Sequence, residues 1–124
     1  MLPVACCLLP SSRWILYGST GEDGASHFEF LEPAESEEWT KGVAASRCAI
    51  REMPAGTVMD WHPAPRRQIV VHISGELEIA LPDGTAHVFG PASARLMDDL
   101  TGRGHLTRVV GPEPVVQVVI HLEE

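Results

Sequence analysis

Six histidines in this chain of 124 residues supply side chains that could carry chemistry. An imidazole takes up or releases a proton near neutral pH and also binds divalent metals, so it suits either use. Among the six, His62 and His105 have polar neighbours that favour such chemistry. We expect the catalytic residues to be His62, His105, Gln68, Arg67 and Asp99.

Charged and aromatic residues near these positions indicate how a substrate would be bound. The planar guanidinium of Arg66 or Arg67 could bind a carboxylate or an enolate oxygen through paired hydrogen bonds. Asp98 or Asp99 could orient the ring of His105 and fix its tautomer. The expected substrate-binding residues are Trp61, Arg66, His72 and Arg95.

A divalent metal is the alternative use of the same side chains. Imidazole nitrogens and an amide oxygen that converge from rigid strands could hold Zn, Fe, Mn or Ni. The candidate ligands are His62, Gln68 and His105, with His72 or Asp98 as a fourth. A neutral amide is a weak ligand, so a metal site and a metal-free acid–base site both remain open.

Each candidate also has a purely structural interpretation. His72 could be a core histidine, His105 a loop cap, and Gln68 a strand residue that holds a neighbouring loop. Asp98 and Asp99 could simply stabilise a turn before a glycine-rich loop. The remaining histidines are expected at the surface or at sheet edges, namely His27, His87 and His121.

Alternation along the chain places several of these residues on one side. If Gln68 points inward, an extended backbone puts His62, Ala64, Arg66, Val70 and His72 on the same side. That side combines polar groups with Val70, which is typical of a pocket wall rather than of a solvated surface.

Short strand-forming segments would position these side chains. Prolines and glycines interrupt any long helical period, and residues 35–41 form the only helix-like window. Residues 82–85, Pro-Asp-Gly-Thr, are a strong hairpin turn. Many short strands separated by turns predict an all-β sandwich or barrel. The expected strands cover residues 13–17, 27–31, 46–53, 68–73, 77–81, 86–89, 106–110 and 115–122.

Length and charge restrict the class of protein. A chain of 124 residues fits one domain. The formal net charge of −8, from 9 Lys+Arg against 17 Asp+Glu, disfavours nucleic acid and anionic membranes as partners. Three cysteines, two of them adjacent, do not form a secreted disulfide framework, which predicts a cytoplasmic protein. No phosphate loop, nucleotide fingerprint or Ser-His-Asp signature appears.

The N-terminal 44 residues differ from the rest. Residues 1–14 are apolar, but they contain two prolines and lack the basic start of a signal peptide. We expect residues 1–44 to form an arm and edge strands that pack on the barrel or on a partner subunit. Residues 45–124 would form the barrel itself.

Residues 56–75, GTVMDWHPAPRRQIVVHISG, resemble the first motif of the cupin family. That motif reads Gly, five residues, His-x-His, three or four residues, Glu, six residues, Gly. Gly56, His62 and Gly75 are in register with it. Ala64 takes the place of the second histidine, and Gln68 takes the place of the glutamate.

The second cupin motif is matched more weakly, from Gly84 onward. Arg95 takes the place of its histidine and Asp99 that of its asparagine. The following residues, DDLTGRGH at 98–105, resemble a subgroup of small bacterial and fungal cupins with HPAPRRQ-like and DxxGxGH-like signatures. Most members of this subgroup have no assigned function.

The resemblance implies a jelly-roll barrel, or double-stranded β-helix, with an N-terminal strand extension. It also implies a homodimer. The function we expect is a small-molecule enzyme that transfers protons inside the barrel, as an isomerase, cyclase or lyase, with or without a divalent metal. A metal-dependent oxygenase is the second enzymatic interpretation, although the incomplete ligand set disfavours oxygen activation. A non-catalytic small-molecule-binding cupin is the third.

Overall fold

The computed structural model of this chain describes residues 15–30 and 40–123. The expected arm at residues 1–14 and most of the helix-like window at 35–41 lie outside the described residues. Ten strands occur in the described ranges: β1 (Ile15–Thr20), β2 (Ser26–Phe30), β3 (Ala45–Met53), β4 (Val58–His62), β5 (Gln68–Ser74), β6 (Glu76–Ala80), β7 (Ala86–Phe89), β8 (Ala94–Asp98), β9 (His105–Val110) and β10 (Val115–Leu122).

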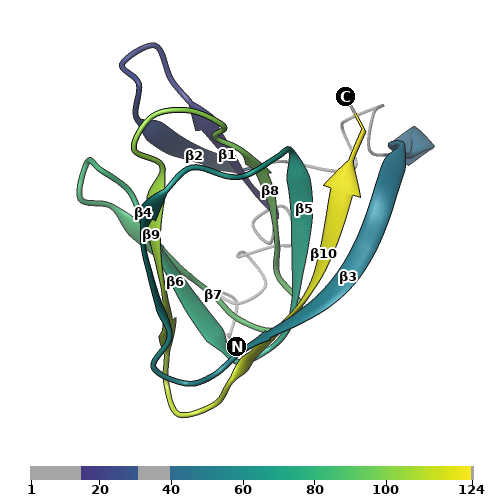
Figure 1. Ribbon diagram of the computed structural model, residues 1–124, viewed down its shortest axis with the longest axis vertical. Helices are drawn as coiled ribbons and strands as arrows, with labels where there is room; N and C mark the ends of the chain where they lie inside the picture. The colour runs from purple at the N-terminus through teal and green to yellow at the C-terminus, as the bar shows by residue number, and fades with distance from the viewer. Residues whose placement is uncertain (1–14, 31–39, 124) are drawn as a thin grey trace, which may run out of the picture.

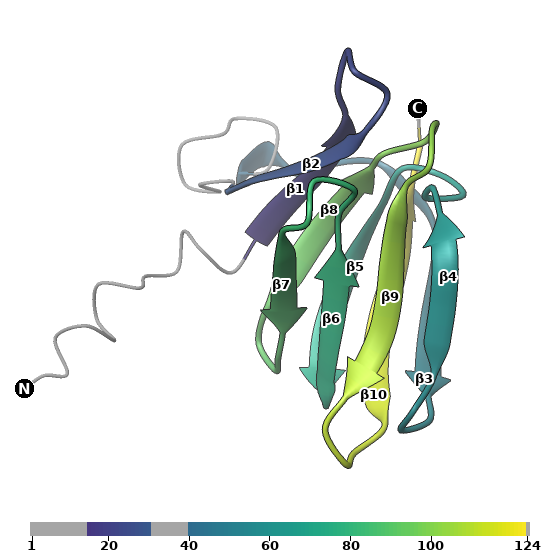
Figure 2. The ribbon, with the colours of Figure 1, turned by 90° about the vertical axis from the view of Figure 1, so that its left-hand side faces the viewer.

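The strands form two sheets that face each other (Figure 1). The larger sheet has the order β2-β1-β8-β5-β10-β3, and the smaller has the order β4-β9-β6-β7. In Figure 2 the smaller sheet faces the viewer, with the β4–β5 and β8–β9 loops at its upper end. The β3–β4 and β9–β10 turns lie at the opposite end. We call these the loop end and the turn end.

The all-β prediction is confirmed, although the sequence pattern does not predict β4 and β8. Strand β8 has the sequence Ala-Arg-Leu-Met-Asp, most of whose residues favour helix when considered alone. It is extended because it pairs with β1 on one side and with β5 on the other. Sheet pairing on both edges therefore overrides local propensity here.

Side chains between the sheets combine apolar clusters with buried polar groups. The larger cluster consists of Met53, Leu77, Ile79, Leu81, Phe89, Val109 and Val115. Burying one such large side chain contributes about 1.5–3 kcal/mol, so this cluster is the main source of cohesion. On β5 the side chains of Gln68, Val70 and His72 are all buried, as the alternation predicts.

The strands thus carry the buried polar side chains on rigid backbone. These side chains are Ser26, Gln68, His72, Arg95, Asp99, His105, Thr107 and Gln117. Within residues 15–30 and 40–123, no helix has the length and apolar content that spanning a bilayer requires.

Candidate active site

Two of the expected catalytic histidines lie side by side at the loop end of the barrel. Strand β4 ends at His62 and β9 begins at His105, and these two residues are partners in the β4–β9 register. Their ring centroids are 4.8 Å apart and the rings are tilted by 57°. The pair therefore forms one site, although its members are distant in sequence.

The close approach of β4 and β9 depends on Gly104. Its φ of +78° is left-handed, and a Cβ atom there would lie 2.0 Å from the carbonyl oxygen of His62. Gly102 is similar, because its Cβ atom would lie 2.2 Å from the carbonyl oxygen of Gly24. The Gly-x-Gly-His sequence thus has a steric reason: only glycine lets the β8–β9 loop reach the neighbouring backbone.

Gly104→Ala is expected to destabilise the fold by about 3 kcal/mol or more, because backbone must move as well as adopt a strained φ. Gly56→Ala is the matched control: Gly56 also has a left-handed φ, of +87°, but nothing lies within 4 Å of the place that a methyl group would take there. This control should cost only about 1–2 kcal/mol. Urea unfolding measures both, and equal losses would contradict the steric argument.

A buried carboxylate orients His105. The Nδ1 atom of His105 lies 2.7 Å from Asp99 Oδ2, and the Ser26 hydroxyl donates to the same oxygen at 2.6 Å. Both side chains of the His105–Asp99 pair are at least 96% buried. Burial opposes ionisation of Asp99, yet the hydrogen bonds from His105 and Ser26 hold its pKa below the ordinary value. Asp99 is therefore a carboxylate at neutral pH.

The hydrogen bonds fix the tautomer of both histidines. The Nδ1 atom of His62 lies 2.6 Å from the carbonyl oxygen of Asp60, which can only accept, so His62 donates through Nδ1. His105 donates through Nδ1 to the Asp99 carboxylate in the same way. In the neutral form, each ring keeps its Nε2 lone pair for a proton or a metal.

This arrangement partly fits a divalent metal. Ligating histidines commonly donate their other ring N–H to a carboxylate or a backbone carbonyl, as His62 and His105 do. In the part of the chain that the structure describes, no group of three or more His, Cys, Asp or Glu side chains is placed to hold a metal. A metal here would therefore rely on the two imidazoles and the amide oxygen of Gln68.

A cavity of about 280 Å³ opens next to His62. Its lining brings together His62, Gln68 and Arg66 from the expected site. The Nη1 atom of Arg66 lies 3.3 Å from His121 Nε2, so a cation and a histidine stand together at the cavity wall. The remaining lining residues are Ala49, Arg51, Met59, Pro63, Pro65, Val119 and His121.

Six expected site residues do not line this cavity: His105, Asp99, Arg67, Trp61, His72 and Arg95. His105 and Asp99 are buried beside His62. The Nε atom of Arg67 lies 3.7 Å from Asp98 Oδ2, which directs Arg67 toward that carboxylate. Trp61 packs its ring against the guanidinium of Arg103, whose Cζ atom lies 4.1 Å from the ring centroid. The structure thus places Arg67 and Trp61 beside the site rather than in the wall of the cavity.

His72 and Arg95 lie in the barrel interior, away from the cavity surface. Both are nearly fully buried, at 1% and 4% exposure. The ring of His72 stacks on Phe89, with centroids 5.2 Å apart, and the Cζ atom of Arg95 lies 5.8 Å from the same ring. A substrate would meet these two residues only at the inner end of the site.

Sequence reasoning missed four residues of this region: Ser26, Arg51, Gln117 and His121. Alternation along β10 puts Gln117 and His121 on one side with Val115 and Val119, but the other side of the strand is apolar as well, so alternation alone does not point them inward. Ser26 and Arg51 carry no signal either, since one begins a short strand and the other lies in a strand whose residues are mostly exposed.

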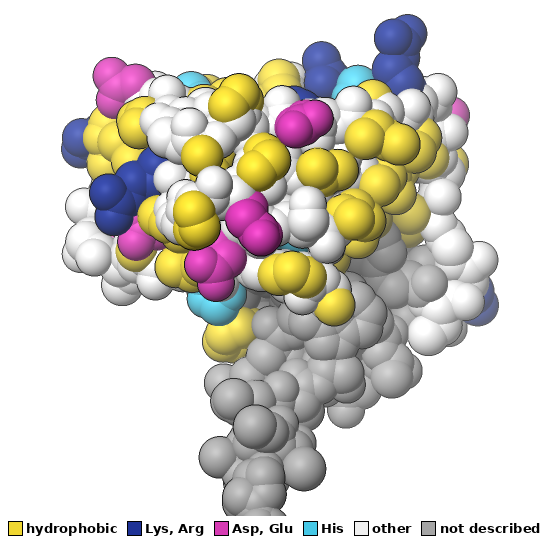
Figure 3. All heavy atoms as spheres, turned by 90° about the horizontal axis from the view of Figure 1, so that it is seen from below, with side chains coloured by type: hydrophobic (Ala, Val, Ile, Leu, Met, Phe, Trp, Pro, Cys, Tyr) yellow, Lys and Arg dark blue, Asp and Glu magenta, His cyan; other side chains and the backbone are white. Residues whose placement is uncertain are grey.

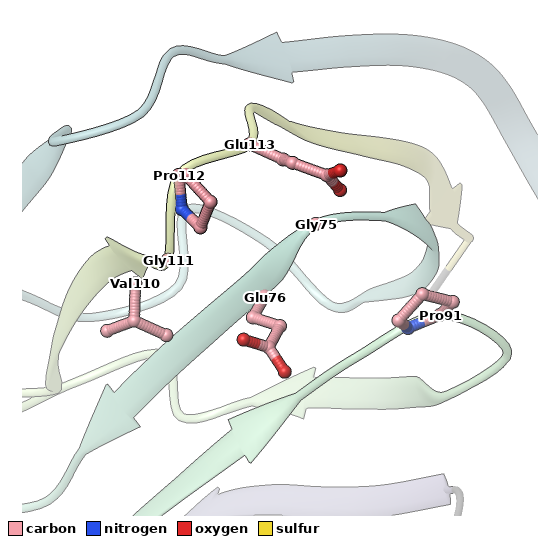
Figure 4. Close-up of a pocket in the computed structure, with 7 residues that line it drawn as sticks. All are labelled: Gly75, Glu76, Pro91, Val110, Gly111, Pro112 and Glu113. Atoms are coloured by element: carbon pink, nitrogen blue, oxygen red, sulfur yellow. The ribbon is translucent and has the colours of Figure 1, made fainter.

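A second cavity, of about 350 Å³, lies at the turn end and carries no comparable chemistry. Figure 4 shows its lining: Gly75, Glu76, Pro91, Val110, Gly111, Pro112 and Glu113. Figure 3, a view from below, shows acidic side chains scattered among hydrophobic ones on that face. Two carboxylates without an imidazole or an arginine do not form an acid–base pair like that of His62 and His105, so we assign no function to this cavity.

Comparison with known proteins gives structural matches only. No known family profile matches the chain, and no curated protein matches it in sequence. The cupin domain of Cnp3 from Schizosaccharomyces pombe superposes with a TM-score of 0.53 at 15% identity, over 86% of this chain and 79% of that one. The polyketide cyclase RemF from Streptomyces resistomycificus gives 0.52 at 15% identity, over 88% and 75%.

A third structure is the DMSP lyase DddQ from Ruegeria pomeroyi DSS-3, with a TM-score of 0.52 at 22% identity. The match covers 62% of this chain and only 38% of DddQ. Identities this low establish the architecture and leave the activity open. Two facing sheets, antiparallel except for the β1–β8 pair, and these matches lead to one structural conclusion: the chain has the cupin fold.

Proposed function

We propose that this chain is a small-molecule enzyme that transfers protons at the loop end of the barrel, in an isomerase, cyclase or lyase type of reaction. The observation that carries the proposal is the buried Ser26–Asp99–His105 series of hydrogen bonds beside His62. A buried carboxylate that orients a histidine is the arrangement used to prepare an imidazole for proton transfer.

His105 acts as the base in this proposal. Its Nε2 atom takes a proton from the carbon next to a substrate carbonyl, and the electron pair of that C–H bond becomes an enolate. The negative charge on Asp99 stabilises the imidazolium that forms. The proton then returns to another atom of the substrate, or a leaving group departs.

His62 and Gln68 complete the proposed mechanism. His62 Nε2 supplies or accepts the second proton, because its ring lies 4.8 Å from that of His105. The Gln68 amide, in the cavity wall, donates to the substrate carbonyl oxygen. Arg66 is close enough to the opening to orient an anionic group of the substrate.

The structural matches are consistent with this reaction type. RemF is a polyketide cyclase and DddQ is a DMSP lyase, so two proteins with a similar fold are described as a cyclase and a lyase. This supports the class of reaction that we propose and does not identify the substrate.

A divalent metal is compatible with the same residues. His62, His105 and Gln68 would hold it, and it would polarise the substrate carbonyl as a Lewis acid. Because its Nδ1 atom donates to Asp99, His105 would bind a metal through Nε2 and could not then take the substrate proton. With a metal, only the roles of Asp99 in orienting His105 and of Arg66 in orienting the substrate would stay the same.

Deuterium exchange tests the proposal without knowledge of the substrate. In D₂O, proton NMR should show faster exchange of the protons next to the carbonyl of pyruvate, 2-oxobutyrate or butanone when the protein is present. His62→Asn and His105→Asn should each lower this rate by about 10²–10⁴-fold. His27→Asn is the control, because His27 is an exposed histidine paired with Asp23.

The outcomes are distinct. Exchange that survives in both His62→Asn and His105→Asn would overturn the proposal. Binding of these compounds without any exchange would make the chain a non-catalytic binding module. Metal analysis of protein purified without chelator, compared with His62→Ala, tests the metal interpretation separately.

A homodimer and a cytoplasmic location remain part of the proposal. In the described ranges, β3 is an edge of the larger sheet and has Ile50 on it, 76% exposed. An apolar edge strand is suited to pairing with a second copy. Cys48 is an exposed free thiol, which is compatible with a reducing compartment. Light scattering of the full chain measures the oligomeric state.

A further inference from the structure

Four polar side chains meet on the inner face of the larger sheet, three of them buried and the fourth, Arg51, exposed. They come from four neighbouring strands of the larger sheet: Arg95 from β8, His72 from β5, Gln117 from β10 and Arg51 from β3. We call them the inner arginine cluster. Arg95, His72 and Gln117 are at least 96% buried, whereas Arg51 reaches the cavity next to His62.

Neither guanidinium of this cluster has a carboxylate partner among the described residues. The hydrogen bonds of Arg51 both go to the amide oxygen of Gln117, at 2.9 and 3.1 Å. Arg95 donates through Nη1 to the sulfur of Met97 at 3.2 Å, and a thioether is a weak acceptor. Asp99 directs its Oδ2 atom to Ser26 and His105, and its buried Oδ1 atom has no hydrogen-bond partner among the described residues. Its charge acts on Arg95 without a hydrogen bond between them.

Several polar atoms of the cluster have no partner in the described structure. They are Arg95 Nε, Gln117 Nε2, and both ring nitrogens of His72. Buried polar atoms are rarely left without hydrogen bonds in folded proteins. Three side chains with unused nitrogens at one place therefore indicate that something else binds there.

The four side chains are close enough to act on one ligand. Gln117 and His72 are register partners on adjacent strands. Phe89 contacts both His72 and Arg95. Burial, and to a lesser extent the charge of Arg51, lower the pKa of Arg95 to about 9, while the Asp99 carboxylate acts to raise it. Arg95 is thus a poorly solvated positive charge, whereas Arg51 is exposed on β3.

The cluster lies behind the wall of the cavity. Gln68 lines the cavity, and its register partner on β8 is Met97, the residue that Arg95 contacts through Nη1. Arg51 belongs to the cluster and to the lining. Arg95, His72 and Gln117 do not line it, so a ligand that enters beside His62 meets Arg51 first and must displace lining side chains to reach the other three.

We propose that the inner arginine cluster binds the carboxylate of a small organic acid whose other end reaches the His62–His105 pair. Removing a guanidinium from water without an opposite charge is costly, and a carboxylate supplies that charge. A carboxylate is planar and accepts paired hydrogen bonds from a guanidinium. A neutral His72 ring has a single N–H, so the unused donors are those of Arg95 Nε, Gln117 Nε2 and one nitrogen of His72. Three donors suit a carboxylate, whereas a phosphate requires more.

This inference rests on the proposed function, because it names the substrate class of the same site. It identifies the substrate as a small carboxylic acid with a reactive carbon next to a carbonyl. Proton transfer then occurs at the loop end, while the anion is held at Arg95 and Gln117.

Propionate and its uncharged amide, propionamide, are the matched probes. At constant ionic strength, propionate at about ten times its Kd should raise Tm by roughly 5 °C, and propionamide should not. Arg95→Met should weaken propionate binding by about 10–100-fold, measured by calorimetry. Arg108→Met is the control, because Arg108 pairs with Glu78 at the surface.

Stability without ligand separates binding from a structural role. If Arg95 is held for a ligand, Arg95→Met in propionate-free buffer should have a Tm equal to or above that of the wild type. A large decrease in Tm together with unchanged propionate affinity would overturn the inference. Should Arg95→Met fail to fold, Arg51→Met, at the open side of the cluster, must show the weaker binding.

Two further measurements distinguish failure of this inference from failure of the proposed function. His105→Asn should bind propionate as the wild type does, although it loses exchange. Loss of propionate binding with intact exchange would refute only the carboxylate site. Propionate binding through Arg95 with no exchange on any probe would refute the enzyme and leave an acid-binding protein.

Discussion

Asp99→Asn is expected to lower the rate of deuterium exchange by about 10³-fold while the barrel stays folded. The wild-type carboxylate accepts from Nδ1 of His105 and from Ser26. An asparagine can turn its NH₂ group toward Nδ1, which favours the other tautomer and leaves Nε2 protonated. His105 could then no longer take a proton from the substrate.

Asp99→Asn should also lower the free energy of unfolding. Losing a buried charge-assisted hydrogen bond costs about 1.5–3 kcal/mol. The folded-state pKa of Asp99 lies below its ordinary value of 3.8, so this carboxylate stabilises the fold above that pH. Its contribution is lost only as the pH falls through the lower folded-state pKa. At pH 7 the full effect is therefore present and urea unfolding can measure it.

Asp23→Asn is the matched control for this experiment. Asp23 also pairs with a histidine, His27, at 3.0 Å, but that pair is exposed. Asp23→Asn should leave the exchange rate and the urea midpoint close to those of the wild type, because solvent screens an exposed ion pair. If Asp99→Asn left the exchange rate within threefold of the wild type, the role of Asp99 in orienting His105 would be wrong.

The sequence predicts the fold, and it selects residues that the structure brings together. The spacing from Gly56 to Gly75 points to His62 and Gln68, and both lie in the wall of one cavity, His62 from β4 of the smaller sheet and Gln68 from β5 of the larger. His105 is expected from the Gly-x-Gly-His residues of the cupin resemblance, and the structure supplies the steric reason, because only glycine at position 104 permits the approach to His62. Of the two candidates to orient His105, Asp98 and Asp99, it is Asp99 that forms the buried hydrogen bond.

Of the inner cluster, His72 and Arg95 are among the expected substrate-binding residues, but Gln117 could not be predicted, because strand alternation does not tell which side of β10 faces the core. On β10, one side carries Val115 and Val119 and the other carries Val116, Val118 and Ile120. Both sides are apolar, so Gln117 could be assigned to either. Only sheet pairing, with β5 on one edge and β3 on the other, directs Gln117 inward against Arg51.

Stability of the wild type is expected to fall by roughly 2–3 kcal/mol between pH 6.5 and about pH 4.5 because of His72. Burial is the main reason that its pKa drops from 6.5 to about 3, and the charges of Arg95, Arg51 and His87 lower it further. The unfolded chain takes up a proton at this histidine below about pH 6.5, whereas the folded chain does not until about pH 3. Acid therefore favours unfolding throughout this window.

His72→Leu removes this titration and should lower the slope of the unfolding free energy against pH by roughly 1.4 kcal/mol per pH unit. Leucine is similar in volume to histidine. Neither ring nitrogen of His72 has a hydrogen-bond partner, so the substitution leaves no other group without its hydrogen bond. His27→Gln, at an exposed position, should keep the wild-type slope. Urea unfolding at a series of pH values measures all three proteins.

A wild type whose stability is constant from pH 6.5 to about pH 4.5 would show that His72 is protonated in the folded barrel. An anion already bound beside Arg95 would also reduce the slope of the unfolding free energy against pH. The series is therefore run first in propionate-free buffer and then repeated with propionate. A smaller slope with propionate would mean that the carboxylate and the proton on His72 bind together.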